Sequence, residues 1–147
     1  MSFFDLLNIP PEFELDIAAL EVAYFKAQRQ FHPDRFVGKP AAEKLAAMQK
    51  SMDINQAYET LKNPLKRAEY LLSLQGIMVG TNSDTVKPSA EILMEVMELR
   101  ENEANADEVK ELIASSNALI ADYFKAKNFA AMAQETLRLG YLRKMVE

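Results

Sequence analysis

The residues best suited to chemistry stand together in the tripeptide His32-Pro33-Asp34. A histidine two positions before an aspartate can supply two metal ligands or a proton-transfer pair. Further carboxylates for such a site would come from Glu91, Glu95 or Glu98. The same tripeptide also suits a polar turn after a helix, because proline keeps the preceding residue out of the helical region. The spacing alone leaves both a reactive site and a rigid loop open.

Composition argues against the reactive site. The 147 residues contain one histidine and no cysteine, which excludes thiolate zinc sites, thiol nucleophiles, disulfides and cysteine-held clusters within this chain. The glycines, at positions 38, 76, 80 and 140, are too scattered for a phosphate-binding loop. We therefore predict a protein that is not an enzyme and that holds no metal or cofactor of its own.

Charged residues fall into two segments of opposite sign. Basic side chains surround the tripeptide, at Lys26, Arg29, Arg35 and Lys39, although the formal net charge is -5. Residues 91–111 are mainly acidic. The two segments suit two different partner surfaces, and a pair of solvated helix faces would explain them equally well. The acidic total disfavours nucleic acid as a partner.

The sequence also indicates a compartment. Hydrophobic residues make up 49% and charged residues 27%, as is usual for a soluble globular protein. No apolar run is long enough to cross a membrane, and the first residues lack the basic start and apolar stretch of a secretion signal. We expect a cytoplasmic protein without a membrane partner.

Helical periodicity on both sides of the tripeptide predicts two paired helices. Asp16 can cap the first helix, which ends before Pro33. Apolar residues recur along it at steps of three and four, at Ile17, Leu20, Tyr24, Ala27 and Phe31. The second helix starts at Ala41 with a stripe of Leu45, Met48, Met52, Ile54, Ala57, Tyr58 and Leu61. Facing stripes would form a hairpin with the tripeptide in its loop.

The remaining chain predicts a linker and further helices. Asn63-Pro64 opens a short helix that Gly76 closes, and the following GIMVGTNSDTVKPS is the best candidate linker. Three more helices are predicted at 89–103, 107–126 and 128–146, as in a three-helix bundle. We therefore predict an all-α fold with an N-terminal domain at 1–75, a linker at 76–88 and a C-terminal helical bundle at 89–147.

The predicted helix 89–103 has more apolar surface than one buried face requires. Ile92, Val96 and Leu99 share one side, and an adjoining side carries Leu93, Met94 and Met97 beside Glu98 and Glu101. Methionine tolerates imperfect shape matching, so the second side suits a protein partner. Alternatively, other helices of the same chain cover both sides.

Residues 1–75 resemble the J-domain family, because His32-Pro33-Asp34 lies between two paired helices and beside basic residues. The resemblance implies a loop that docks on a DnaK-type chaperone and stimulates its ATP hydrolysis. Asp34 would pair with an arginine of the chaperone. His32 and Pro33 would hold the loop, and Lys26, Arg29 and Arg35 would steer encounter with an acidic chaperone surface.

The segments NPLKRAEYLLSLQG and AEILMEVMELRE resemble the HscB family of J-proteins, and this resemblance spans nearly the whole chain. It implies that the bundle binds an IscU-type iron–sulfur scaffold protein and presents it to an HscA-like chaperone. The scaffold contacts would fall on Leu93, Met94, Met97, Glu98, Glu101 and Tyr141. Relatives often have leucine at Met97 and phenylalanine at Tyr141, and Asn105 aligns with a further acidic contact.

An alternative function keeps the J-domain and changes the client. The bundle could serve another client, or it could dimerise, because exposed Leu93, Met94 and Met97 could pair with their own copies. We expect a chain that is monomeric on its own.

Overall fold

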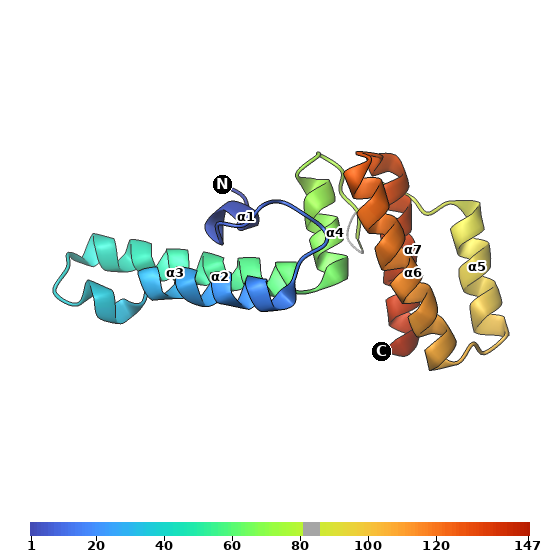
Figure 1. The fold of residues 1–147 in the computed structure, drawn as a ribbon, viewed down its shortest axis with the longest axis horizontal. Helices are drawn as coiled ribbons and strands as arrows, with labels where there is room; N and C mark the ends of the chain where they lie inside the picture. The colour runs from blue at the N-terminus through green and yellow to red at the C-terminus, as the bar shows by residue number, and fades with distance from the viewer. Residues whose placement is uncertain (81–85) are drawn as a thin grey trace. The chain divides into compact units, whose positions relative to one another are not determined.

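The computed structural model describes residues 1–80 and 86–147, which contain helices and loops and no β-strand. The elements are α1 (Phe3–Leu6), α2 (Ile17–Gln30), the 3-10 turn η1 (Pro33–Phe36), α3 (Ala41–Leu61), α4 (Pro64–Ser73), α5 (Ala90–Glu101), α6 (Ala106–Lys125) and α7 (Phe129–Val146) (Figure 1). The predicted all-α class is confirmed. The fold divides into two compact units, Met1–Lys66 and Arg67–Glu147.

The first unit is built on the predicted hairpin of α2 and α3, with α1 packed against α3. Asp16 caps α2 as expected, since its carboxylate accepts the Ala18 N–H at 2.9 Å. Phe4, Leu20, Ile54 and Leu61 are almost completely buried and form the centre of this core. Their burial fixes α2 and α3 side by side with the connecting loop at one end.

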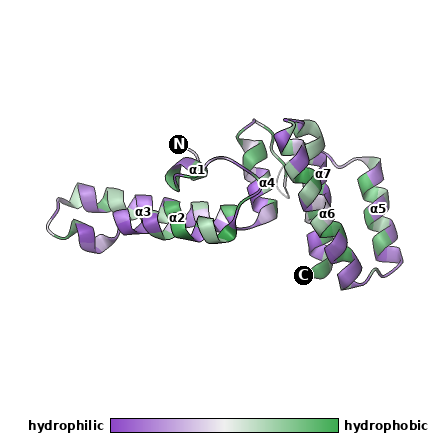
Figure 2. Cartoon of the chain, in the orientation of Figure 1, coloured by the Kyte–Doolittle hydropathy of each residue, from purple (hydrophilic) through white to green (hydrophobic). Residues whose placement is uncertain are grey.

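The buried stripe of α3 differs from the predicted one. Leu45, Met48 and Met52 are exposed, whereas Ile54, Ala57 and Leu61 are buried as expected. In this part of α3 the small side chain of Ala47 is buried instead. Ala27 of α2 is buried too, and small residues of this kind let two helices approach closely. Purple and green segments alternate along both helices in Figure 2, as expected for helices buried on one side.

The second unit contains most of α4 together with α5, α6 and α7, and the last three confirm the predicted C-terminal helices. The core between α6 and α7 is made by Val109, Ile120, Met132, Leu139 and Leu142. Asn105 and Asn128 cap α6 and α7 by accepting the N–H groups of Glu108 and Ala131. These caps begin the two helices within two residues of the predicted starts.

The predicted linker lies only partly within the described structure, because residues 81–85 are outside the described residues. Gly76 closes the turn after α4 with a φ of +78°, in the left-handed region that glycine accommodates best. The division between the two compact units falls inside α4, at Lys66 and Arg67. The assignment of 1–75, 76–88 and 89–147 as domain, linker and domain stays a prediction.

Candidate partner-binding surfaces

The loop between α2 and α3 is held by its own residues. His32 is the N-cap of η1, and its Nδ1 accepts the backbone N–H of Asp34 at 3.2 Å. The Arg35 N–H donates to the His32 carbonyl at 2.9 Å, and Pro33 is the first residue of the turn. The Asp34 carboxylate lies 3.5 Å from His32 Nδ1, and the Asp34 side chain is 90% exposed. The loop therefore presents a carboxylate to solvent from a defined turn.

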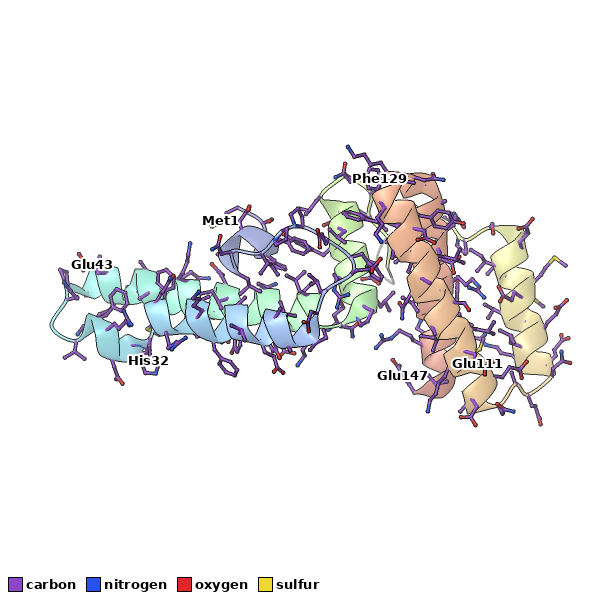
Figure 3. The ribbon with its side chains drawn as sticks, viewed as in Figure 1. Met1, His32, Glu43, Glu111, Phe129 and Glu147 are labelled. Carbon is purple, nitrogen blue, oxygen red and sulfur yellow. The ribbon has the colours of Figure 1, made fainter. Side chains whose placement is uncertain are left out.

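Basic side chains lie before and within this loop. Lys26 and Arg29 are exposed on α2, three residues apart and therefore on neighbouring positions of the helix surface. Arg35 is exposed within η1 itself. Figure 3 labels His32 and Glu43, which mark the end of the hairpin that carries the loop. The structure thus combines the predicted tripeptide and basic residues on the first unit.

A row of side-chain hydrogen bonds positions α2 against α3, and nothing in the sequence indicated it. Gln28 Nε2 donates to Asn55 Oδ1 at 2.6 Å, and the Ser51 hydroxyl donates to Gln28 Oε1 at 2.8 Å. The Tyr24 hydroxyl also donates to Asn55 Oδ1 at 2.6 Å, and its ring stacks on Tyr58 with centroids 4.3 Å apart. Polar residues within a helical stripe gave no signal, because they are equally typical of a solvated face.

The second candidate surface is the outward side of α5. Ile92 and Val96 are buried against the unit, while Leu93, Met94 and Met97 are exposed. Glu98 and Glu101 are exposed on the same helix. This arrangement supports the interpretation of two apolar sides, one buried and one available to a partner.

Tyr141 belongs to α7 rather than α5 and is half-buried. It follows Arg138 by three residues, so the two side chains are neighbours on the helix surface. Arg138 in turn binds Glu95 of α5. Tyr141 therefore lies on the side of α7 that faces α5.

The acidic residues of α5 do not assemble a metal site with the histidine in the described part of the chain. Both carboxylate oxygens of Glu95 bind Arg138, at 2.8 Å each. Across residues 1–80 and 86–147, no cluster of three or more histidine, cysteine, aspartate or glutamate side chains could hold a metal ion.

Among the described helices, none combines the length and the apolar character needed to cross a membrane.

The chain is similar to known proteins over nearly its whole length. The DnaJ domain family model matches residues 2–70, which include the hairpin and its loop. The structure of the chaperone HscB from Vibrio cholerae is similar, with 34% identity, a TM-score of 0.80 and coverage of 99% of this chain and 93% of that chain. Human co-chaperone protein HscB gives 27% identity, a TM-score of 0.81 and coverage of 99% and 78%.

The Jac1 co-chaperone from Saccharomyces cerevisiae shares the fold, with 23% identity, a TM-score of 0.71 and coverage of 99% and 95%. The similarity to the Vibrio cholerae protein extends over both units and includes sequence as well as fold. Together with the N-terminal DnaJ domain and its exposed His32-Pro33-Asp34 loop, it shows that this chain belongs to the HscB family of J-domain co-chaperones.

Proposed function

We propose that this chain stimulates the ATPase of a DnaK-type chaperone of the HscA kind. We further propose that it delivers an IscU-type scaffold protein to that chaperone during iron–sulfur cluster assembly and transfer. The observation that carries the proposal is the exposed Asp34 carboxylate, presented by a turn that His32 and Pro33 hold, in a chain of the HscB family. The cluster would remain on the scaffold, because this chain has no cysteine.

The chaperone would bind the loop and the adjoining basic surface. An exposed carboxylate can accept two hydrogen bonds from an arginine, a geometry that selects one orientation of the partner. Lys26, Arg29 and Arg35 would raise the rate of encounter with an acidic chaperone surface, and salt would screen this effect. Binding accelerates hydrolysis only if the bound protein favours the hydrolysis-competent conformation of the chaperone. A preference of about 1.4 kcal/mol for that conformation permits a tenfold change in the rate of hydrolysis.

The scaffold would bind the outward side of α5. Leu93, Met94 and Met97 form a contiguous apolar strip, and Glu98 and Glu101 supply acidic side chains next to it. Such a strip with a charged border matches the usual anatomy of a protein interface. Tyr141 would extend the surface from α7. A cytoplasmic location and a monomeric free protein remain predictions from the sequence.

The proposal is tested by single-turnover ATP hydrolysis by an HscA-type chaperone, with this protein and an IscU-type scaffold added separately and together. We expect stimulation by this protein alone and a larger stimulation when both are present. His32→Gln should abolish stimulation in both cases. Stimulation without any effect of the scaffold would leave the chaperone assignment intact and reject the scaffold. No stimulation at any concentration would reject the proposed chaperone.

A second candidate function is a J-domain co-chaperone whose C-terminal unit forms dimers. The observation in its favour is that Leu93, Met94 and Met97 are exposed together and could pair with a second copy. Sedimentation at increasing protein concentration separates the two functions. A monomer at high concentration rejects the dimer, whereas a dimer that Met97→Glu dissociates would support it.

A further inference from the structure

Helix α5 carries two apolar sides, and hydrophobicity alone does not determine which one is buried. Ile92 and Val96 are 8% and 3% exposed, whereas Leu93 and Met97, each one residue further along, are 42% and 58% exposed. Leucine and methionine gain about as much from burial as isoleucine and valine do. A rotation of α5 about its axis would therefore exchange one apolar side for the other at little cost in buried apolar area.

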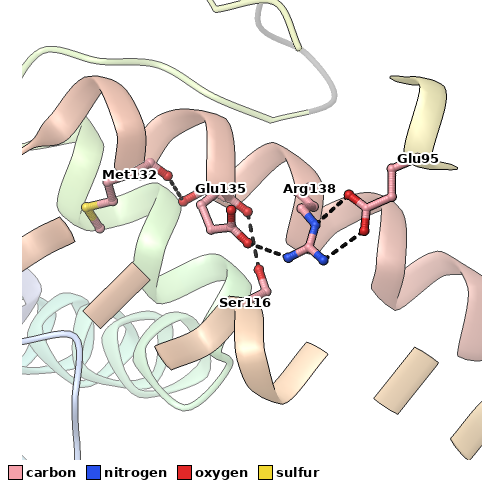
Figure 4. A network of polar contacts seen from close by, with 6 residues as sticks. Glu95, Ser116, Met132, Glu135 and Arg138 are labelled. Carbon is pink, nitrogen blue, oxygen red and sulfur yellow. Dashed lines mark hydrogen bonds and ion pairs between the residues drawn. The ribbon is translucent and has the colours of Figure 1, made fainter. Parts of the chain in front are cut away.

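Directional polar contacts with α7 distinguish the two orientations. Arg138 Nε and Nη2 donate to the two carboxylate oxygens of Glu95, both at 2.8 Å, in a bidentate pair (Figure 4). Arg138 Nη1 donates to Glu135 at 2.7 Å, which holds the guanidinium from the other side. The Arg138 side chain is 13% exposed. The hydrogen bonds that Arg138 donates to Glu95 raise the pKa of the guanidinium, which therefore stays charged.

A second contact one helical turn earlier on α7 fixes the start of α5. The Ser89 N–H donates to Gln134 Oε1, and Gln134 Nε2 donates to the Lys87 carbonyl, both at 2.8 Å. Gln134 and Arg138 are four residues apart and lie on the same side of α7. Gln134 binds the residues just before α5, and Arg138 binds Glu95 within it. Together the two contacts define the axial position of α5 and its rotation about its axis.

We propose that the Arg138–Glu95 pair is a specificity device that selects which apolar side of α5 is buried and which is presented to solvent. Glu95 lies on the same helix side as Ile92 and Leu99, so rotating α5 to bury Leu93 and Met97 would withdraw the carboxylate from Arg138. That rotation would leave a largely buried guanidinium with one partner in place of two. Partly buried ion pairs in other proteins add little stability and can define a single arrangement.

The consequence for binding rests on the proposed function. If the outward side of α5 is the scaffold surface, Arg138 and Glu95 are positioning residues that keep Leu93, Met94 and Met97 available without touching the scaffold themselves. The orientation of α5 can be measured without any partner.

The absence of cysteine in this chain allows the orientation to be read chemically. Single cysteines are placed in the full chain as Ile92→Cys on the buried side or Met97→Cys on the exposed side, and their alkylation by iodoacetamide is timed. We expect position 97 to react at least about tenfold faster than position 92, because a buried thiol reacts only after local opening. In a Glu95→Ala background, which removes the carboxylate without adding a large apolar side chain, the two rates should converge to within about threefold.

Glu95→Ala is the informative change because it removes the carboxylate and leaves the Arg138–Glu135 pair on α7 intact. The matched control is Glu91→Ala, which removes the same charge from an exposed position of the same helix and should leave the rate ratio unchanged. Glu95→Gln retains one acceptor oxygen and should give an intermediate ratio. If Glu95→Ala does not fold, Glu95→Gln carries the test. A ratio equal to that of the parent in a folded variant at position 95 overturns the inference.

Scaffold affinity measured on the same variants separates this inference from the proposed function. Converging alkylation rates with unchanged scaffold binding would retain the role of Arg138 and reject α5 as the scaffold surface. An unchanged rate ratio together with lost scaffold binding would overturn the role of the pair and support a direct contact of Glu95 with the scaffold.

Discussion

His32 contacts the main chain of its own loop through the same nitrogen that faces Asp34. Nδ1 accepts the Asp34 N–H at 3.2 Å and lies 3.5 Å from the Asp34 carboxylate. One nitrogen cannot accept from the amide and donate to the carboxylate at the same time. While Nδ1 accepts the Asp34 N–H it does not bind the Asp34 carboxylate, which therefore keeps its acceptor capacity for a partner.

Asp34→Asn tests this division of roles. The side chain is 90% exposed, so we expect the free energy of unfolding to change by less than about 0.5 kcal/mol. Stimulation of the chaperone ATPase should be lost, because the amide cannot accept a charge-assisted bidentate pair. Denaturant unfolding and single-turnover hydrolysis measure the two effects. Glu43→Gln removes one charge just beyond the loop and should leave both unchanged; equal loss in the two variants would contradict a specific role for Asp34.

A second prediction at this scale concerns two residues of α3 that are only two positions apart. Ile54 is fully buried and Met52 is 61% exposed. Ile54→Ala should lower the free energy of unfolding by about 2–5 kcal/mol, and Met52→Ala by less than about 0.5 kcal/mol. Urea denaturation of both variants gives the comparison. Similar losses would contradict the observed burial of α3.

At the scale of elements, the hairpin could be predicted from the sequence, but the row of hydrogen bonds between α2 and α3 could not. The Asp16 cap and the end of α2 before Pro33 are local and were predicted correctly. The buried side of α3 passes through Ala47 and Ser51, and apolar periodicity favoured Met48 and Met52. Which side is buried depends on Gln28 of the opposite helix, and no local pattern contains that information.

The same limit applies to α5. Its two apolar sides were evident from the sequence, and the structure confirms that Leu93, Met94 and Met97 are exposed. The contact that selects this side joins Glu95 and Arg138, which are 43 residues apart. A glutamate in an acidic segment gives no sign that a distant arginine binds it. Sequence reasoning accordingly considered Glu95 only as a metal ligand.

The start of α6 gives a prediction at the element scale. Asn105 uses its side chain to accept the Glu108 N–H at 2.8 Å. Asn105→Ala should cost about 1 kcal/mol of stability, because an orphan N–H loses its acceptor. Asn105→Asp should retain the cap and the stability. Thermal unfolding of both variants tests this prediction. Equal destabilisation would show that the side-chain hydrogen bond to the Glu108 N–H does not account for the stability that residue 105 contributes.

At the scale of the whole molecule, the two candidate surfaces belong to different compact units. The loop with His32-Pro33-Asp34 lies in Met1–Lys66, and the exposed side of α5 lies in Arg67–Glu147. Substitutions at distant sites that share no partner have additive effects on free energy. A co-chaperone of this kind would join two partners by binding each one independently, and the scaffold would gain from the high local concentration beside the chaperone.

The last prediction follows from this independence. It compares three variants: His32→Gln, the double variant Leu93→Ala with Met97→Ala, and the combination of all three substitutions. The alanine pair should weaken scaffold binding by about 2–4 kcal/mol if these are central anchors, and it should leave stimulation by this protein alone unchanged. His32→Gln should abolish stimulation and retain full scaffold affinity. Calorimetric binding and single-turnover hydrolysis supply the two readouts. If His32→Gln weakened scaffold binding as much as the alanine pair does, the two surfaces would be coupled through the chain, because the loop substitution changes no residue of α5.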